Sequence, residues 1–160
     1  MTTSTPAIAT PPRLDLSAVL PSAYRALREL DGVSRKVGLE PRLLELVRLR
    51  ASQINGCAFC MDMHTLDAQH AGEDETRLAV ISAWREARHL YTEREQAALA
   101  LTESVTLLSE THVPDDVWTR AAAVFPDEQL AGLLTAIIAI NAWNRLGVST
   151  RMVPGEYKPS

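Results

Sequence analysis

The sequence predicts an all-α protein, a compact bundle of about six to seven helices. Hydrophobic residues make up 46% of the 160 residues but aromatic residues only 5%, which is typical of a helical protein and not of a β-sandwich or barrel. Apolar side chains recur with a helical period along most of the chain, with charged side chains between them. A chain of this length holds one domain with its own core. We expect that domain at residues 16–150, between a flexible N-terminal tail (1–15) and a C-terminal tail (151–160).

Start and stop signals place the individual helices. Proline suits the first position of a helix and glycine the position after its end, while Thr92-Glu-Arg-Glu95 has the form of a capping box. These signals predict helices at about Pro21–Lys36, from Pro41 to the Asn55-Gly56 break, Cys57–Ala71, Glu73–Arg88, Thr92–Ser109, from Pro114, and Asp127–Leu146, the last ended by Gly147. The helix opened by Pro41 is apolar over much of its circumference, so we expect it at the centre of the bundle.

The only two cysteines, Cys57 and Cys60, form a C-x-x-C pair, and His64 follows one helical turn later. At about 100° per residue the three side chains fall within roughly 60° of arc and share one helix face. A thiol in the first turn of a helix lies at the positive end of the helix dipole, which favours the thiolate. His64 can accept a proton from Cys60. The pattern therefore offers an attacking sulfur, a resolving sulfur and a base.

Two other interpretations of the cysteine pair are weaker. A zinc site would need a fourth ligand beyond the two thiols and His64, either a carboxylate or one of His70, His89 and His112, and none of these has a recognisable spacing. A structural disulfide would close a very short loop and so constrain the unfolded chain little. Redox chemistry is favoured, and we expect neither a metal nor a bound cofactor.

Glu45 lies on the narrow polar side of the helix opened by Pro41. Its spacing alone predicts a surface ion pair with Arg48 or Arg42.

The last helix carries a second polar cluster, Asn141, Trp143, Asn144 and Arg145. The simpler interpretation is a helix C-terminus, where Arg complements the dipole and Asn caps. Alternatively, the two asparagines hold a neighbouring turn such as Asn55-Gly56, and Trp143 forms a subunit interface or a pocket wall.

Charge and hydropathy exclude several functions. A net charge of −4 and a pI near 5.6, without a dense basic block, argue against nucleic-acid binding. The N-terminus does not resemble a secretory signal, and the apolar run from Leu130 to Ile140 is too short to span a membrane. Closely spaced cysteines suit a reducing compartment, so we expect a cytoplasmic protein.

The pattern E-x11-C-x-x-C-x3-H, with L-R-x-S-Q-x-N directly before Gly56 and the first cysteine, resembles the alkylhydroperoxidase D-like branch of the carboxymuconolactone decarboxylase family. The stretch FPDEQLAGLLTAIIAINAWNRL is also similar, and the likeness extends from about residue 20 to residue 150. The resemblance implies an all-α homo-oligomer, a trimer or hexamer, with the active site near a subunit interface. It also implies that Cys60 attacks peroxide, that Cys57 resolves, and that His64 and Glu45 form a proton relay. The chain departs from the characterised enzyme at Phe59, where that enzyme has a histidine.

We therefore predict a thiol peroxidase or thiol–disulfide oxidoreductase in antioxidant defence, which uses a peroxide and an external dithiol of lipoyl or thioredoxin type. The order of the cysteines stays open, because the helix dipole favours Cys57 as the more acidic thiol and the resemblance favours Cys60. Two alternatives remain: a cofactor-free lyase or isomerase that uses Glu45 and His64 as acid and base, and a non-catalytic oligomer whose thiols sense oxidation.

Overall fold

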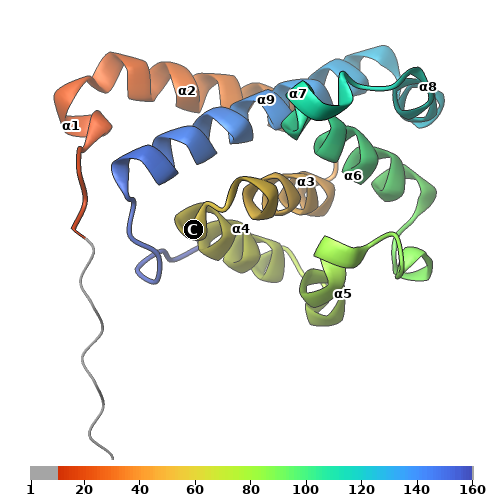
Figure 1. Ribbon diagram of the computed structural model, residues 1–160, viewed down its shortest axis with the longest axis horizontal. Coiled ribbons are helices and arrows are strands. Elements are labelled where there is room, and N and C mark those ends of the chain that lie inside the picture. Colours follow the sequence, from red (N-terminus) through yellow and green to blue (C-terminus); the bar gives the residue numbers. More distant parts are fainter. Residues whose placement is uncertain (1–10, 160) are drawn as a thin grey trace, which may run out of the picture.

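The computed structural model describes residues 11–159, and within them it contains helices, 3₁₀ turns and loops but no β-strand (Figure 1). The α-helices are α1 (Leu16–Val19), α2 (Pro21–Val33), α3 (Pro41–Asn55), α4 (Ala58–His70), α5 (Glu75–Val80), α6 (Glu93–Thr106), α7 (Leu108–Thr111), α8 (Asp115–Val124) and α9 (Asp127–Thr150). Turns of 3₁₀ helix lie at Ser34–Lys36, Ile81–Ala83 and Arg88–Leu90. The predicted all-α class is confirmed. The helix count in this range exceeds the predicted one because α1 and α7 are single turns of 4 residues each.

Several helix ends lie where the sequence signals place them. Pro41 opens α3, and Gly56 ends it in a left-handed conformation with φ 66°, which glycine adopts without steric cost. Thr92 and Glu95 form the capping box of α6. As predicted, α3 is central: α4, α6 and α9 pack against it, and α2 lies along the other side of α9 (Figure 1).

Two groups of buried apolar side chains form the core around α3. The first joins α3 to α6 and α9 through Leu44, Val47, Leu101, Leu133 and Ile137. The second joins it to α6 and the α5 region through Leu46, Leu49, Ile81, Trp84 and Leu99. Burying one such side chain contributes about 1.5–3 kcal/mol. Residues of α3 belong to both groups. This packing fixes the position of α3, and with it the position of the polar residues that α3 presents to α4.

The predicted helix at Glu73–Arg88 is wrong in its extent, because α5 ends at Val80 and a 3₁₀ turn follows. The buried residues Leu78, Ile81 and Trp84 are three apart in sequence. Three residues complete one turn of a 3₁₀ helix, so this tighter winding keeps them on one face. The Trp84 indole N–H also donates to Glu103 Oε1 at 3.0 Å.

The prediction that Gly147 ends the last helix is wrong, because α9 continues to Thr150 and Arg151 caps it. Gly147 is buried inside the helix, and a Cβ atom there would lie 2.9 Å from Cys57 Sγ and 3.5 Å from Cys60 Sγ. The glycine thus permits a close approach between α9 and the C-x-x-C pair instead of ending the helix.

Helix α9 is long and apolar enough to cross a membrane, with a mean hydropathy of 1.2 over its best window, of which 44% is buried inside the domain. Core helices of water-exposed domains pass the same test, and α9 packs against α2, α3 and α6.

The two predicted tails differ in what the structure describes. Residues 1–10 of the N-terminal tail lie outside the described residues. The C-terminal tail from residue 152 to residue 159 contains no helix but contacts α4, where Gly155 N–H donates to Asp62 and the Tyr157 hydroxyl donates to Asp67. The proposed domain boundaries stay a prediction.

Candidate active site at the start of helix α4

Cys57 and Cys60 are joined in a disulfide at the N-terminal end of α4. Cys57 is the N-cap residue, and its Sγ accepts the backbone N–H of Cys60 at 3.3 Å. The left-handed turn at Gly56 sets this position, and Cys57 N–H donates back to Ser52 O at 3.0 Å. The N-cap position directs unpaired N–H groups at the Cys57 sulfur and so favours its thiolate when the disulfide is reduced.

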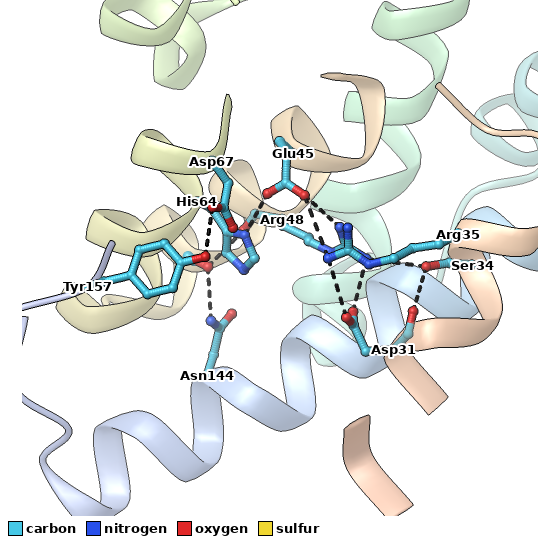
Figure 2. Close-up of polar contacts among 10 residues, drawn as sticks. Asp31, Ser34, Arg35, Glu45, Arg48, His64, Asp67, Asn144 and Tyr157 are labelled. Carbon is cyan, nitrogen blue, oxygen red and sulfur yellow. Dashed lines mark hydrogen bonds and ion pairs between the residues drawn. The ribbon is translucent and has the colours of Figure 1, made fainter. Parts of the chain in front are cut away.

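Glu45 and His64 meet in the interior between α3 and α4, where each is 4% exposed. His64 Nδ1 lies 2.7 Å from Glu45 Oε2 (Figure 2). The prediction of a surface ion pair for Glu45 is wrong in its location, because α4 covers this side of α3. Its predicted partner is right: Arg48 Nη1 donates to Glu45 Oε1 at 2.7 Å. Glu45 therefore joins an arginine and a histidine, one at each oxygen.

Arg48 is fully buried and links Glu45 to the end of α2. Its Nη2 donates to Asp31 Oδ1 at 3.0 Å and to Ser34 Oγ at 3.3 Å (Figure 2). Buried charges are tolerated where each is paired and hydrogen-bonded, and the planar guanidinium can contact two carboxylates at once.

The surroundings of Glu45 keep it ionised. Burial by itself raises the pKa of its carboxyl group, but the hydrogen bond and charge of His64 and the charge of Arg48 outweigh burial and hold that pKa below its ordinary value. A carboxylate hydrogen-bonded to Nδ1 of a histidine fixes the ring orientation and leaves Nε2 for another partner.

A pocket of about 750 Å³ opens beside this pair. The polar groups in its lining include Glu45, His64, Asp67 and Tyr157. Aromatic and thioether side chains also line it: Tyr24, Phe59, Met63, Trp143 and Met152. Pockets of this size that combine apolar walls with placed polar groups bind small organic molecules.

The two sulfurs lie behind the pocket wall, since each cysteine is 2% exposed and neither lines the pocket. Phe59 and Trp143 pack against the cysteines on one side and line the pocket on the other. Phe59 thus makes this wall apolar. Trp143 forms a pocket wall, one of the two roles considered for it, with its ring edge-to-face on Tyr24 at 5.2 Å.

Three residues of this region were missed by sequence reasoning: Asp67, Tyr157 and Gly147. Asp67 follows His64 by three positions on the same face of α4, a spacing that could have found it. The Tyr157 hydroxyl donates to Asp67 Oδ1 at 2.7 Å, and burial together with this neighbour raises the pKa of Tyr157 to about 12. Nothing in the sequence pairs Tyr157 with α4. A glycine inside an apolar helical run was the available signal for Gly147.

Glu45, His64 and Asp67 are also near enough to hold a metal ion, because one ligand atom from each lies within 4.8 Å of the others. Glu45 and His64 are already hydrogen-bonded to one another, and Glu45 to Arg48. The Glu45 oxygens and His64 Nδ1 are therefore already paired and are not free ligands.

The polar cluster of α9 joins that helix to the end of α3, and its interpretation as a helix C-terminus is wrong. Asn55 Nδ2 donates to Asn141 Oδ1 at 3.0 Å and to Asn144 Oδ1 at 2.9 Å. Asn144 Nδ2 in turn donates to Ser52 Oγ at 2.9 Å. The two asparagines therefore hold the α3–α4 turn through the Asn55 side chain, as the alternative proposed. Arg145 Nη1 donates to Asn141 O at 2.9 Å, within the helix.

Known sequences show the family to which the chain belongs. Residues 21–104 match the model of the carboxymuconolactone decarboxylase family. The chain is 35% identical over 137 residues to the uncharacterized protein YdfG of Bacillus subtilis. The matched stretch covers 86% of this chain and 92% of YdfG.

Solved structures extend the comparison. A protein of unknown function from Agrobacterium tumefaciens, ATU0492, suggested to be the antioxidant defence protein AhpD, is 39% identical with a TM-score of 0.87, over 92% of this chain and 100% of that one. The debrominase Bmp8 in complex with 2,3,4-tribromopyrrole shares the fold at 15% identity and a TM-score of 0.74, over 87% of this chain and 74% of that one. The chain therefore belongs to the carboxymuconolactone decarboxylase family and has the fold of its AhpD-like members.

Proposed function

We propose that this protein is a thiol-dependent peroxidase of antioxidant defence that cycles through the Cys57–Cys60 disulfide. The observation that carries the proposal is the disulfide at the start of α4, one turn from a buried His64–Glu45 pair. The likeness to ATU0492, suggested to act in antioxidant defence, supports the same role.

In the oxidative half, His64 accepts the proton of the Cys60 thiol, and the Cys60 thiolate attacks one oxygen of a peroxide ROOH. The O–O bond breaks, Cys60 becomes a sulfenic acid, and the leaving RO⁻ takes a proton and departs as an alcohol. Glu45 orients the imidazole and stabilises its positive charge. The Cys57 thiolate then attacks the Cys60 sulfur, which forms the disulfide and releases hydroxide, protonated to water.

In the reductive half, an external dithiol attacks the disulfide, forms a mixed disulfide and leaves as a cyclic disulfide with both protein thiols restored. Cys57 suits the leaving position, because its sulfur at the N-cap is stabilised as a thiolate. With Cys60 as the attacking thiol and Cys57 as the leaving thiolate, the mechanism agrees with the resemblance, which makes Cys60 attack, and with the helix dipole, which makes Cys57 the more acidic thiol.

The partners and setting belong to the same proposal. They are a peroxide, a dithiol of lipoyl or thioredoxin type, a trimeric or hexameric assembly with the pocket near a subunit interface, and the cytoplasm.

A second candidate is acid–base catalysis on a small organic acid by Glu45 and His64. It is favoured by one observation: the pocket reaches these two side chains and not the cysteines.

Peroxide-dependent oxidation of dihydrolipoamide, with cumene hydroperoxide as the peroxide, separates the two candidates. We expect turnover in the wild type, loss of turnover in C57S and in C60S, and a reduction of about 10²-fold in H64N, where the base is removed. His89 is an exposed histidine in a 3₁₀ turn, so H89N serves as the matched control and should retain wild-type rates. Turnover that survives in both cysteine variants would overturn the peroxidase proposal.

The same variants identify the attacking thiol. After peroxide treatment, mass spectrometry should find a sulfenic acid on Cys60 in C57S. A sulfenic acid on Cys57 in C60S, with none on Cys60 in C57S, would reverse the assignment.

A further inference from the structure

Residues 152–159, here called the C-terminal strap, lie along α4 beyond the stretch that matches the family model. Two hydrogen bonds of 2.7 Å attach the strap to α4, from Gly155 N–H to Asp62 Oδ2 and from the Tyr157 hydroxyl to Asp67 Oδ1. Figure 2 shows the Tyr157 ring extending to Asp67 beside His64.

The strap forms part of the wall of the pocket beside the redox pair. Met152 and Tyr157 line the pocket. Met152 N–H donates to Gly147 O at 3.0 Å, and a Cβ atom on Gly147 would lie 3.7 Å from Met152 Sδ and 2.9 Å from Cys57 Sγ. Met152 therefore lies next to the point where α9 approaches the disulfide.

Most of the rest of the pocket lining belongs to helices, three of which are anchored in the core. Helices α2, α3, α4 and α9 supply most of the other lining side chains; α3, α4 and α9 have buried residues along their length, whereas α2 has none. The strap has no helix, and none of its residues is buried. Segments with few buried contacts are those that open at the lowest free energy.

Access matters here because thiol–disulfide exchange requires direct contact with sulfur. An incoming thiolate must approach one sulfur in line with the S–S bond and expel the other as a thiolate, and the second thiol of the same molecule must then attack the mixed disulfide. With both cysteines 2% exposed, this approach needs part of the wall to move.

We propose that the C-terminal strap, fastened by Tyr157 to Asp67, is the specificity-determining wall of the redox site and selects reductants by size. A small dithiol passes through a small opening, whereas a protein dithiol reaches the disulfide only when the strap is released. The inference rests on the proposed function only in requiring a reducible Cys57–Cys60 disulfide.

The test is the second-order rate of disulfide reduction in the oxidised protein, measured with dithiothreitol and with reduced thioredoxin, without any peroxide. In Y157F and D67A, we expect the rate with thioredoxin to rise about tenfold, since a hydrogen bond to a charged acceptor is lost from the closed state. The rate with dithiothreitol should rise less than about twofold. D67N keeps a carbonyl acceptor for the hydroxyl and should lie between wild type and D67A.

Y91F is the matched control, because the Tyr91 hydroxyl also donates a hydrogen bond, to Arg77 O in another part of the core. Its rates should equal those of the wild type with both dithiols. Unchanged rates in Y157F and D67A, or an equal rise with both dithiols, would overturn the inference. Since no peroxide is used, the selectivity can be found even if peroxide turnover fails, so the two proposals fail separately.

Discussion

Glu45 and Glu103 are two glutamates of the same bundle that bind arginines, but only Glu45 also binds a histidine. Glu45 Oε1 accepts from Arg48 and its Oε2 contacts His64. Both oxygens of Glu103 face donors that stay protonated near neutral pH: Arg50 and Trp84 at Oε1 and Arg85 at Oε2.

The difference between the two glutamates lies in what each cluster can do with a proton. Histidine has an ordinary pKa near neutrality and can gain and lose a proton during a reaction, whereas arginine cannot. Glu45 also lines the pocket, and Glu103 does not. The Glu45 cluster is therefore suited to proton transfer. The Glu103 cluster instead links α3, α6 and the turn after α5.

Among the substitutions that test this difference, the largest change in stability is expected at Arg48. R48M leaves the carboxylates of Glu45 and Asp31 without their buried partner, which should lower the free energy of unfolding by about 3–5 kcal/mol. R48K should lose less, because an ammonium group keeps the charge but cannot span both carboxylates in a fork. Urea unfolding measures the free energy of unfolding of both variants. A decrease below about 1 kcal/mol in R48M would show that the guanidinium does not stabilise the cluster.

The next effect compares the two glutamates directly in turnover. E45Q removes the negative charge behind His64, so kcat for peroxide-dependent dithiol oxidation should fall about 10²-fold. E103Q should keep the wild-type kcat at a temperature where it is folded, because its cluster touches neither the pocket nor the disulfide. An equal fall in both variants would mean that the glutamates act through stability alone.

A smaller effect concerns acid pH. Because the pKa of Glu45 is lowered in the folded protein, its stabilisation is fully present above the ordinary value of 4.5 and is lost as the pH falls through the lower folded value. The wild type should therefore lose stability on acidification with an extra slope of at most about 1.4 kcal/mol per pH unit, which E45Q lacks. Thermal unfolding of both proteins between neutral pH and acid tests this, and parallel curves would contradict it.

The smallest effect is expected at Arg85, which binds Glu103 from an exposed position, with 51% of its side chain accessible. R85M should cost about 0–1 kcal/mol, less at high salt, and leave kcat unchanged. A cost as large as that of R48M would remove the distinction between the two clusters.

Local signals predicted much of the helical framework. Pro41 and Gly56 marked both ends of α3, and Thr92 with Glu95 marked the start of α6. These predictions succeeded because capping depends on residues within one turn of each other. Two predicted helix ends were wrong because they depend on packing. After Val80, buried residues three apart in sequence favour a 3₁₀ turn, and Gly147 lies inside α9 where that helix approaches the disulfide.

The candidate site divides in the same way. Cys57, Cys60 and His64 lie at positions three and four apart on one helix, so their proximity could be predicted from spacing. Glu45 belongs to another helix, and its spacing favoured the surface; only the family resemblance linked it to His64. Asp67 was within reach of the same helical argument, whereas Tyr157 lies ninety residues further along the chain.

By itself, the sequence determined the helical class, the central position of α3 and the C-x-x-C pair at a helix start, because these follow from periodicity, capping and spacing over a few residues. Only the tertiary structure decided that Glu45 is buried against His64, that Arg48 compensates its charge, that Gly147 lies against the disulfide, and that the C-terminal strap is hydrogen-bonded to α4. Those contacts join residues distant in sequence, and the packing of one helix on another selects them.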